Sequence, residues 1–342
     1  MSLEKRFTDA WYQPFGWTWG LAPLLLLSNS YVKRKRRQYL HHRQTQSYQA
    51  SVPVIVVGNI SVGGTGKSPM VLALVELLKL HGFSPGIVTR GHKRQQQDAV
   101  LVTPTDEALA VGDEPLMLSR RASCPVAVAP KRVEAIKLLE NTQQVDVIIS
   151  DDGLQHYAMD RDIEIVMVDA QRGLGNRQLL PVGPLREPAE RLEEVDFAFA
   201  IGEQFPLKLA TPSFCAPLEL SELRKVADSQ QTMPLQILAQ PSWQVVAGIG
   251  NPQRFLQSLK QHGLSPDAEQ LLYSDHHDYT RSDLSDAKRV VMTEKDAVKV
   301  EAFAKPEDDW WFVAAKLPLP DSFTAPLIEK LHTIVKKKQA YE

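Results

Sequence analysis

The sequence is poor in cysteine. Only two of its 342 residues are cysteine, Cys124 and Cys215, and they lie far apart with no spacing typical of metal ligands. This excludes a disulfide framework and a zinc site built on cysteine. A reducing compartment fits this usage best.

The sequence also has no excess of charge of either sign. It carries 39 Lys and Arg residues against 41 Asp and Glu residues, a net charge of -2. This balance gives no general electrostatic reason to bind nucleic acid, and we expect none as a partner. A hydrophobic content of 43% is that of an ordinary folded protein, and the length allows two domains.

A long hydrophobic run is missing as well. The longest candidate, Phe15–Leu27, is interrupted by Gly20 and Pro23 and is shorter than the roughly 20 apolar residues that span a bilayer. The basic cluster Lys33–Arg37 follows the run, which is the wrong order for an export signal. Aromatic, apolar and basic residues in this order favour attachment to a membrane surface. A true span and a helix of a soluble core remain the alternatives.

The strongest motif is Val54–Ser68, VIVVGNISVGGTGKS. A buried strand, a glycine-rich turn and a helix start in this order predict a phosphate-binding P-loop for ATP. In the strict motif a glycine would stand at position 61, where this chain has Ser61. The alternative, a glycine turn without a ligand, does not account for the GTGKS order. The predicted nucleotide contacts are Ser61, Val62, Gly63, Gly64, Thr65, Gly66, Lys67 and Ser68.

Two acidic motifs accompany the loop. The apolar run VDVIIS ends in Asp151 and Asp152, which is typical of a Walker B element that holds Mg²⁺. Asp113 and Glu114 stand just before an apolar helix. From the residues alone, helix capping by one of the two is the favoured interpretation, and a metal ligand or general base is the alternative.

The pattern of elements predicts an α/β fold. It comprises a P-loop NTPase-like α/β/α domain, a smaller second α/β domain and an N-terminal membrane-surface helical segment. Prolines recur and periodicity weakens between about residues 206 and 240, and we expect the domain boundary there. The expected divisions are an N-terminal segment at 1–48, a kinase-type domain at 49–218, a linker at 219–240 and a C-terminal domain at 241–342.

Three strings in the second half are weak signals by themselves. The turn GIGNP at 248–252 only superficially matches a nucleotide fingerprint. SDHHDY at 274–279 is a polar loop in the favoured interpretation, and a metal site in the alternative. TEKD at 293–296 looks like a guanine-reading motif, but such a site should belong to the P-loop sheet.

Taken together, seven motifs resemble one family. GNISVGGTGKSP, GDEP, DDGLQH, LLPVGPLREP, AGIGNPQRF, SDHHDY and TEKDAVK occur in the order expected of tetraacyldisaccharide 4'-kinases, across roughly residues 50 to 315. Ser61 is typical of that family. The family's R-G-Y-G-type string is replaced here by Arg90-Gly91-His92-Lys93, so His92 must supply the aromatic contact or the contact is lost.

The resemblance implies an activity and roles for residues. The family phosphorylates the 4'-hydroxyl of tetraacyldisaccharide 1-phosphate with ATP and Mg²⁺, giving lipid IVA in lipid A biosynthesis. Lys67 and Ser68 would bind the phosphates and Mg²⁺, and Asp151 and Asp152 would complete the metal region. The remaining implied residues are Asp113 as general base, His276 as its orienting partner, and Glu114, Arg132, Gln155, His156, Arg186 and Glu187 lining the cleft.

The resemblance also implies a location. The enzyme would be peripheral or monotopic on the cytoplasmic face of the inner membrane of a Gram-negative bacterium, with a lipid substrate and no obligate protein partner. Two competing hypotheses are a soluble P-loop ATPase or GTPase of the metal-chaperone type and a non-catalytic nucleotide sensor at the membrane. The first needs metal-binding residues near the loop, and the acidic motifs disfavour the second.

Overall fold

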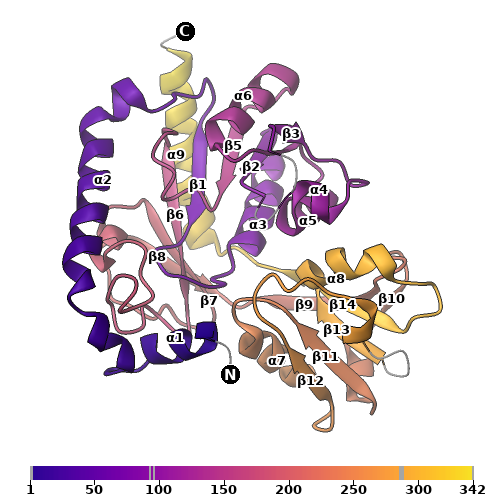
Figure 1. The fold of residues 1–342 in the computed structure, drawn as a ribbon. Coiled ribbons are helices and arrows are strands. Elements are labelled where there is room, and N and C mark those ends of the chain that lie inside the picture. The colour runs from indigo at the N-terminus through magenta and orange to yellow at the C-terminus, as the bar shows by residue number, and fades with distance from the viewer. Residues whose placement is uncertain (1–2, 92–93, 95–96, 285–288, 341–342) are drawn as a thin grey trace.

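The computed structural model describes residues 3–91, 94, 97–284 and 289–340. The predicted difference at His92 and Lys93 lies outside these residues. The chain forms an eight-stranded and a six-stranded sheet, and Figure 1 shows each sheet in a separate lobe. We call them the large lobe and the small lobe.

The large lobe is built on an eight-stranded sheet with the order β3-β4-β2-β5-β1-β6-β7-β8. Its pairings are parallel except for that of β3 with β4. The strands are β1 (Val54–Gly58), β2 (Pro85–Thr89), β3 (Val100–Leu101), β4 (Val126–Val128), β5 (Val147–Asp151), β6 (Ile163–Asp169), β7 (Phe197–Ile201) and β8 (Ser213–Ala216).

Helices cover both faces of this sheet, because its central strands are apolar on both sides. Along β1, Ile55 and Val57 enter one core while Val54 and Val56 enter the other. The first core includes α3 (Lys67–Leu80), α5 (Asp113–Ala122) and the C-terminal helix α9 (Asp321–Gln339), and the second includes α6 (Arg132–Thr142). The remaining short helices are α4 (Ala108–Val111) and η2 (Ala189–Glu193). The predicted P-loop α/β/α architecture is therefore present.

The small lobe has a six-stranded sheet with the order β10-β9-β14-β13-β11-β12. Its strands are β9 (Glu219–Lys225), β10 (Thr232–Met233), β11 (Trp243–Ala247), β12 (Glu269–Leu272), β13 (Arg289–Thr293) and β14 (Trp310–Lys316). Its helices are α7 (Pro252–Gln261), α8 (Glu294–Val300), η3 (Leu235–Ala239), η4 (Arg281–Asp283) and η5 (Glu301–Phe303). β9 pairs antiparallel with β14, and these two neighbouring strands carry the chain between the lobes.

The structure differs from two of the predicted boundaries. Residues 219–240 were expected to be a linker, but they hold β9, β10 and η3 of the small lobe. Residues 241–342 were expected to form the C-terminal domain, but α9 at the end of this range packs Phe323, Leu327 and Leu331 into the core of the large lobe. β9 escaped prediction because its sequence ELSELRK has little apolar content and lies between prolines.

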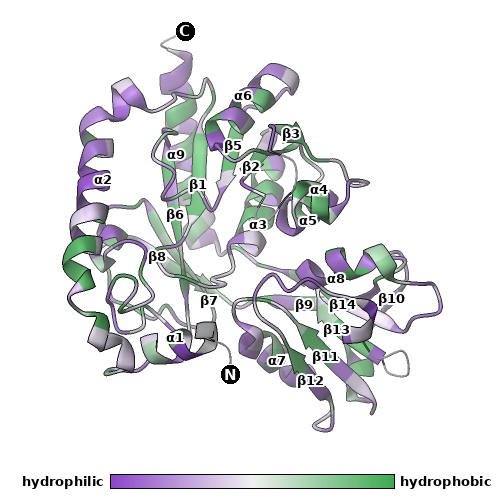
Figure 2. Ribbon diagram, viewed as in Figure 1, coloured by the Kyte–Doolittle hydropathy of each residue, from purple (hydrophilic) through white to green (hydrophobic). Residues whose placement is uncertain are grey.

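The N-terminal segment forms α1 (Leu3–Trp11), η1 (Trp17–Leu21) and the long α2 (Leu24–Gln46) along the outer edge of the large lobe. Figure 2 shows the start of α2 as hydrophobic and most of the remaining helix as hydrophilic. Phe15, Leu26 and Leu27 are exposed at 88%, 76% and 71%. No helix in the described part of the chain is long and apolar enough to cross a membrane.

Candidate active site

The P-loop connects β1 to α3 at the carboxyl edge of the large sheet. Gly63 and Gly66 have φ values of 109° and 89°, which a residue with a Cβ rarely adopts. The buried Asn59 side chain donates hydrogen bonds to the carbonyls of Ser61 at 2.7 Å and Gly63 at 3.3 Å. Asn59 thus holds the loop from within, a role that the sequence analysis missed.

Lys67 begins α3 and points toward the end of β5. Its Nζ lies 3.4 Å from Asn59 Oδ1 and 3.5 Å from Asp152 Oδ1. Arg186 lies 3.5 Å from the other oxygen of Asp152. Burial would raise the pKa of Asp152, but the charges of Lys67, Arg186 and Arg132 outweigh it and lower that pKa. Asp152 is therefore held as a carboxylate beside the P-loop.

Asp151 is the last residue of β5 and is only 1% exposed. Thr89 donates to its Oδ2 at 3.3 Å, while its Oδ1 has no hydrogen-bond partner among the described residues. Burial, followed by the charge of Glu114, raises the pKa of Asp151 to about 7. An orphaned buried carboxylate oxygen beside a P-loop suits a cation.

The donor set fits Mg²⁺ bound together with a nucleotide. Within the described ranges, no three His, Cys, Asp or Glu side chains are grouped as a metal site. Mg²⁺ in phosphate sites needs only one or two carboxylates, because phosphate oxygens and waters supply the other ligands. Asp151, Asp152 and the hydroxyl of Ser68 meet that requirement.

The two lobes meet at Asp113 and His276. Asp113 is the first residue of α5 in the large lobe, and its Oδ2 lies 3.0 Å from Nδ1 of His276 in the small lobe. His276 has a φ of 56°, which is uncommon for a residue with a side chain. Burial would raise the pKa of Asp113, but the His276 hydrogen bond and the charges of Lys295 and Lys299 hold it at about 2.

Asp113 does not cap its helix. The N-cap residue of α5 is Gly112, and no side chain there bonds the helix N-terminus in the capping position. Asp113 Oδ1 accepts the N–H of its neighbour Glu114, at 2.9 Å. The capping interpretation that the residues alone favoured is therefore wrong, and Asp113 is directed across the lobe boundary.

Lys295 completes this cluster from the N-terminus of α8. Its ammonium group lies 3.0 Å from Glu114 Oε1, 3.3 Å from Asp275 Oδ1 and 3.0 Å from Nε2 of His276. Since an ammonium can only donate, Nε2 accepts and the proton of the imidazole is on Nδ1, facing Asp113. Burial lowers the pKa of Lys295, but the surrounding carboxylates outweigh burial and raise it.

Asp151, Asp152, His276 and Lys295 line one large cavity of about 1470 Å³, whereas the buried Asp113 is not among its lining residues and lies next to the lining residue His276. The small lobe closes directly on the P-loop, because a Cβ on Gly250 would lie 2.5 Å from the backbone nitrogen of Gly64. Arg172 donates to the carbonyl of Gly250 at 3.1 Å. Among the residues lining the cavity are Gly63, Gly64, Thr65, Gly66, Lys67, Ser68, Glu114, Arg132, Asp151, Asp152, Gln155, His156, Arg186, Arg254, Asp275, His276 and Lys295.

Comparison with known proteins identifies the family. The model of the tetraacyldisaccharide-1-P 4'-kinase family matches residues 17–332. The chain belongs to this family. Tetraacyldisaccharide 4'-kinase of Aeromonas hydrophila is 43% identical over 94% of both chains, and that of Shewanella oneidensis is 41% identical over 98% of both. LpxK from Aquifex aeolicus, crystallised in complex with ATP, has a TM-score of 0.76 at 25% identity and covers 93% of this chain and 99% of its own.

The remaining residues implied by the family fall into two groups. Arg132 donates to the carbonyls of Asp151 at 2.9 Å and Asp152 at 3.2 Å, and its backbone N–H donates to Nε2 of His156 at 3.2 Å. Burial and nearby cations, led by Arg132, lower the pKa of His156 to about 4. These groups lie on the cavity wall, as the resemblance implied.

Glu187 and Ser61 lie behind the wall instead. Glu187 is 2% exposed and accepts hydrogen bonds from Gln155 at 2.8 Å and from the hydroxyl of Tyr157 at 2.9 Å. Gln155 also donates to the carbonyl of Asn59 at 3.0 Å. Glu187 was expected to line the cleft, but neither it nor Ser61 is among the lining residues. Their position indicates support of the P-loop from beneath.

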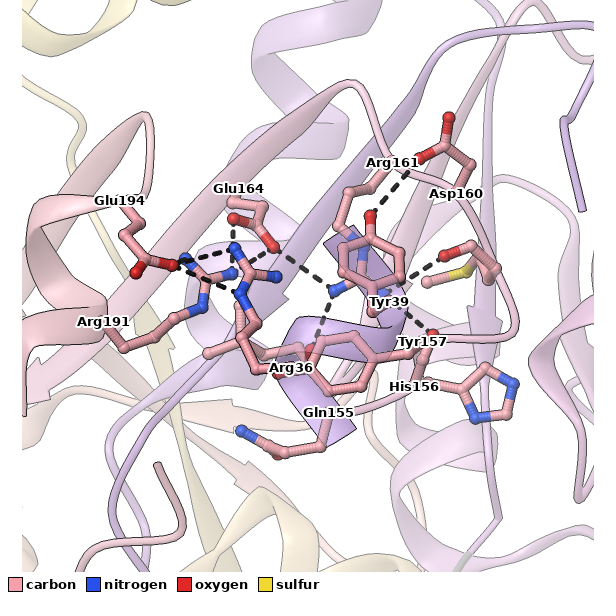
Figure 3. Close-up of polar contacts among 12 residues, drawn as sticks. Arg36, Tyr39, Gln155, His156, Tyr157, Asp160, Arg161, Glu164, Arg191 and Glu194 are labelled. Carbon is pink, nitrogen blue, oxygen red and sulfur yellow. Dashed lines mark hydrogen bonds and ion pairs between the residues drawn. The ribbon is translucent and has the colours of Figure 1, made fainter. Parts of the chain in front are cut away.

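A cation–aromatic cluster joins this support to α2 (Figure 3). Tyr39 of α2 stacks on Tyr157 with ring centroids 4.7 Å apart, and the guanidinium of Arg161 lies over the Tyr39 ring. Arg36 of α2 pairs with Glu194 at 3.0 Å. These contacts fix α2 to the segment that carries Gln155 and His156.

Proposed function

We propose that this chain transfers the γ-phosphoryl group of ATP to the 4'-hydroxyl of tetraacyldisaccharide 1-phosphate, which gives lipid IVA. Membership of the family supports the reaction, and the ATP complex of the Aquifex protein supports the nucleotide. The observation that carries the proposal is the contact between Asp113 and His276 across the lobes, because His276 lines the same cavity as the P-loop.

Charge neutralisation and alignment are the main requirements of phosphoryl transfer. Lys67 and the N–H groups at the start of α3 would bind the phosphates, and Ser68, Asp151 and Asp152 would hold Mg²⁺. When bound, Mg²⁺ neutralises charge on the phosphates. Arg186, which pairs with Asp152, adds a second positive charge on the same wall.

Asp113 is the proposed general base for the sugar hydroxyl. With its pKa at about 2 it is a weak base, so it would take the proton late, when transfer has made the hydroxyl oxygen acidic. The Nδ1 proton of His276 holds one carboxylate oxygen of Asp113 in place. Because His276 belongs to the small lobe, the base is oriented only when the lobes are closed.

The lipid substrate requires access to a membrane. We infer that the protein lies on the cytoplasmic face of the inner membrane, with Phe15, Leu26 and Leu27 entering the headgroup region and the exposed Lys33, Arg34 and Arg37 near anionic lipid. The exposure of these apolar residues supports this orientation. The same segment supplies Thr8, Trp11, Tyr12 and Lys35 to the cavity wall.

The structure disfavours the guanine-binding alternative. Asp296 of the TEKD string is fully buried and accepts hydrogen bonds from the N–H of Gly248 at 3.2 Å and the hydroxyl of Thr293 at 2.6 Å. Lys295 is bound to carboxylates and His276. Asp296 is therefore bonded within the small lobe, and Lys295 is bonded to groups of both lobes.

A transfer assay tests the proposal. Protein, Mg²⁺, γ-phosphate-labelled ATP and tetraacyldisaccharide 1-phosphate in mixed micelles should yield labelled lipid IVA. Lys67→Ala should lower the rate on the order of 100-fold or more, because phosphate charge is then uncompensated. Lys260→Ala, on the exposed side of α7, is the control and should keep the wild-type rate. Hydrolysis of ATP without labelled lipid would contradict the proposal.

A further inference from the structure

The start of α7 is fixed against the large lobe next to the P-loop. Asn251 caps this helix by accepting the N–H of Arg254 at 3.3 Å, and its side-chain amide donates to Asp169 Oδ2 at 2.9 Å. Asn251 and Asp169 are both buried. Gln257, one turn further along, accepts from Gln171 of the large lobe at 2.6 Å. Figure 1 shows α7 on the side of the small lobe nearest to β7.

This anchoring brings the Arg254 side chain against the last glycine of the P-loop. Its Nη2 lies 3.8 Å from the position that a Cβ on Gly66 would occupy, and Arg254 lines the cavity together with Gly64–Ser68. Its Nη1 is buried and has no hydrogen-bond partner within the described residues. A guanidinium is rarely buried unless it is paired.

The nearby carboxylate does not supply the missing partner. Asp169 Oδ1 accepts the N–H groups of Gln171 at 2.9 Å and Arg172 at 3.0 Å, and its Oδ2 accepts from Asn251. Burial lowers the pKa of Arg254, the charge of Asp169 opposes this from a distance, and the charge of Arg172 lowers the pKa further. Two arginines with little compensating charge here indicate an anionic ligand.

The topology indicates which part of a nucleotide this ligand is. β1 lies between β5 and β6. Asp151 ends β5, and a hydroxyl activated by Asp113 must meet the transferred phosphoryl group on that side of Lys67. Arg254 lies on the other side, near Ile201 at the end of β7 and Asp169 at the end of β6. The rest of the nucleotide must extend toward it.

We propose that Arg254 binds the phosphate groups of the nucleotide that are not transferred, so that the small lobe supplies a cationic contact to the P-loop site. This rests on the proposed function. It makes nucleotide binding and closure of the small lobe favour each other, because Arg254 and His276 are carried by the same lobe. A guanidinium also matches phosphate oxygens in a bidentate geometry that lysine lacks.

The test compares ADP and ATP binding to Arg254→Met and to the wild type. ADP retains both non-transferred phosphates, so the Kd of ADP and the Kd of ATP should rise by similar factors, roughly 10- to 100-fold for a lost charged hydrogen bond. Lys260→Met, on the exposed side of the same helix, is the matched control and should leave both unchanged. A rise for ATP alone would place the contact at the γ-phosphate and overturn the proposal.

Thermal unfolding without nucleotide separates this role from a structural one. Arg254→Met removes a cation whose buried Nη1 has no hydrogen-bond partner among the described residues, so its Tm should equal or exceed that of the wild type, while the Tm gain on adding ADP should shrink. A lower Tm with unchanged ADP affinity would contradict the proposal. If Arg254→Met does not fold, Arg254→Gln replaces it. A Kd for ADP equal to that of the wild type in Arg254→Gln would contradict the proposal.

Nucleotide binding by the wild type and by Lys67→Met is measured in parallel, which separates a failure of the proposed function from a failure of the role of Arg254. If the wild type does not bind ADP or ATP, or if Lys67→Met binds both as the wild type does, the proposed function fails. The other case is that the wild type binds ADP and ATP, Lys67→Met does not bind them, and Arg254→Met binds them with the Kd of the wild type. Only the proposed role of Arg254 would then be wrong.

Discussion

At the scale of residues, the site is organised by charges that hold one another in defined protonation states. Lys295 fixes the tautomer of His276, and His276 and two lysines keep Asp113 ionised. Asp151, in contrast, has its pKa raised toward neutrality by burial. Carboxylates with opposite pKa shifts within one cleft are typical of sites where one group handles a proton and another a cation.

His156 gives a pH prediction at this scale. Its pKa is lowered to about 4, below the ordinary value of 6.5, by burial and by neighbouring cations. Above pH 6.5 His156 is neutral in both the folded and the unfolded state. As the pH falls from 6.5 toward 4, the unfolded state binds a proton that the folded state does not, so the free energy of unfolding decreases. His156→Gln can still accept the Arg132 N–H but cannot titrate.

Thermal unfolding at pH 7.5 and pH 5.0 measures this effect. The fall in Tm between the two pH values should be smaller for His156→Gln than for the wild type. His262→Gln, at an exposed helix end, is the control and should behave as the wild type does. An equal fall in all three proteins would show that His156 is not held neutral.

At the scale of elements, sequence patterns predicted the strands that burial requires to be apolar and the turn whose backbone geometry requires glycine. The strand Val54–Gly58, the glycine turn and the strand ending at Asp151 are each marked by apolar runs and glycines, so their prediction succeeded. β9 was missed because its pairing with β14 depends on a partner about 90 residues away in sequence. Lone polar residues such as Asn59 and Lys295 were missed as site residues because only the fold gives them partners.

The turn GIGNP, a weak signal in sequence, acquires a clear role from the contact of Gly250 with Gly64. In Gly250→Ala the new Cβ would lie 2.5 Å from the Gly64 nitrogen, so the small lobe must move back from the P-loop. A displacement near 1 Å at a catalytic group costs on the order of 100-fold in rate, and we expect a loss of kcat of that size.

Kinetics and circular dichroism together check the Gly250 prediction. The far-UV spectrum of Gly250→Ala should match the wild type, because the substitution affects a contact between lobes. Gly20→Ala, where a Cβ meets no atom within 4 Å, is the control and should retain full activity. Wild-type kcat in Gly250→Ala would show that close contact of the two loops is not needed.

At the scale of the whole molecule, three parts converge on one cavity. The large lobe supplies the P-loop and the acidic strand ends, the small lobe supplies His276, Lys295 and Arg254, and the N-terminal segment borders the same cavity. The sequence predicted the two α/β units and the N-terminal segment. It could not predict that α9 returns to the large lobe, since an amphipathic helix does not specify the surface that it covers.

The exposed leucines of α2 provide a prediction at this scale. Leu26→Glu combined with Leu27→Glu removes two apolar contacts with lipid and adds two negative charges. Binding to vesicles of anionic phospholipid, measured by flotation, should weaken more than roughly tenfold. Turnover of the lipid should fall while ADP affinity stays unchanged.

A matched control distinguishes this surface from exposed leucines in general. Leu80→Glu combined with Leu109→Glu changes two leucines that are exposed at 83% and 64% on other helices. This variant should bind vesicles as the wild type does. Equal vesicle binding by both double variants would show that α2 does not contact the membrane.

Asp113 and His276, brought together from two lobes, are proposed to act as one unit on the sugar hydroxyl. The most direct measurement is a double-mutant cycle on kcat for phosphate transfer to tetraacyldisaccharide 1-phosphate, using Asp113→Asn, His276→Ala and the combined variant. Each single substitution should lower kcat on the order of 100-fold or more, and the combined variant should be little worse than Asp113→Asn alone. Wild-type kcat in His276→Ala, or losses that multiply in the combined variant, would contradict the account.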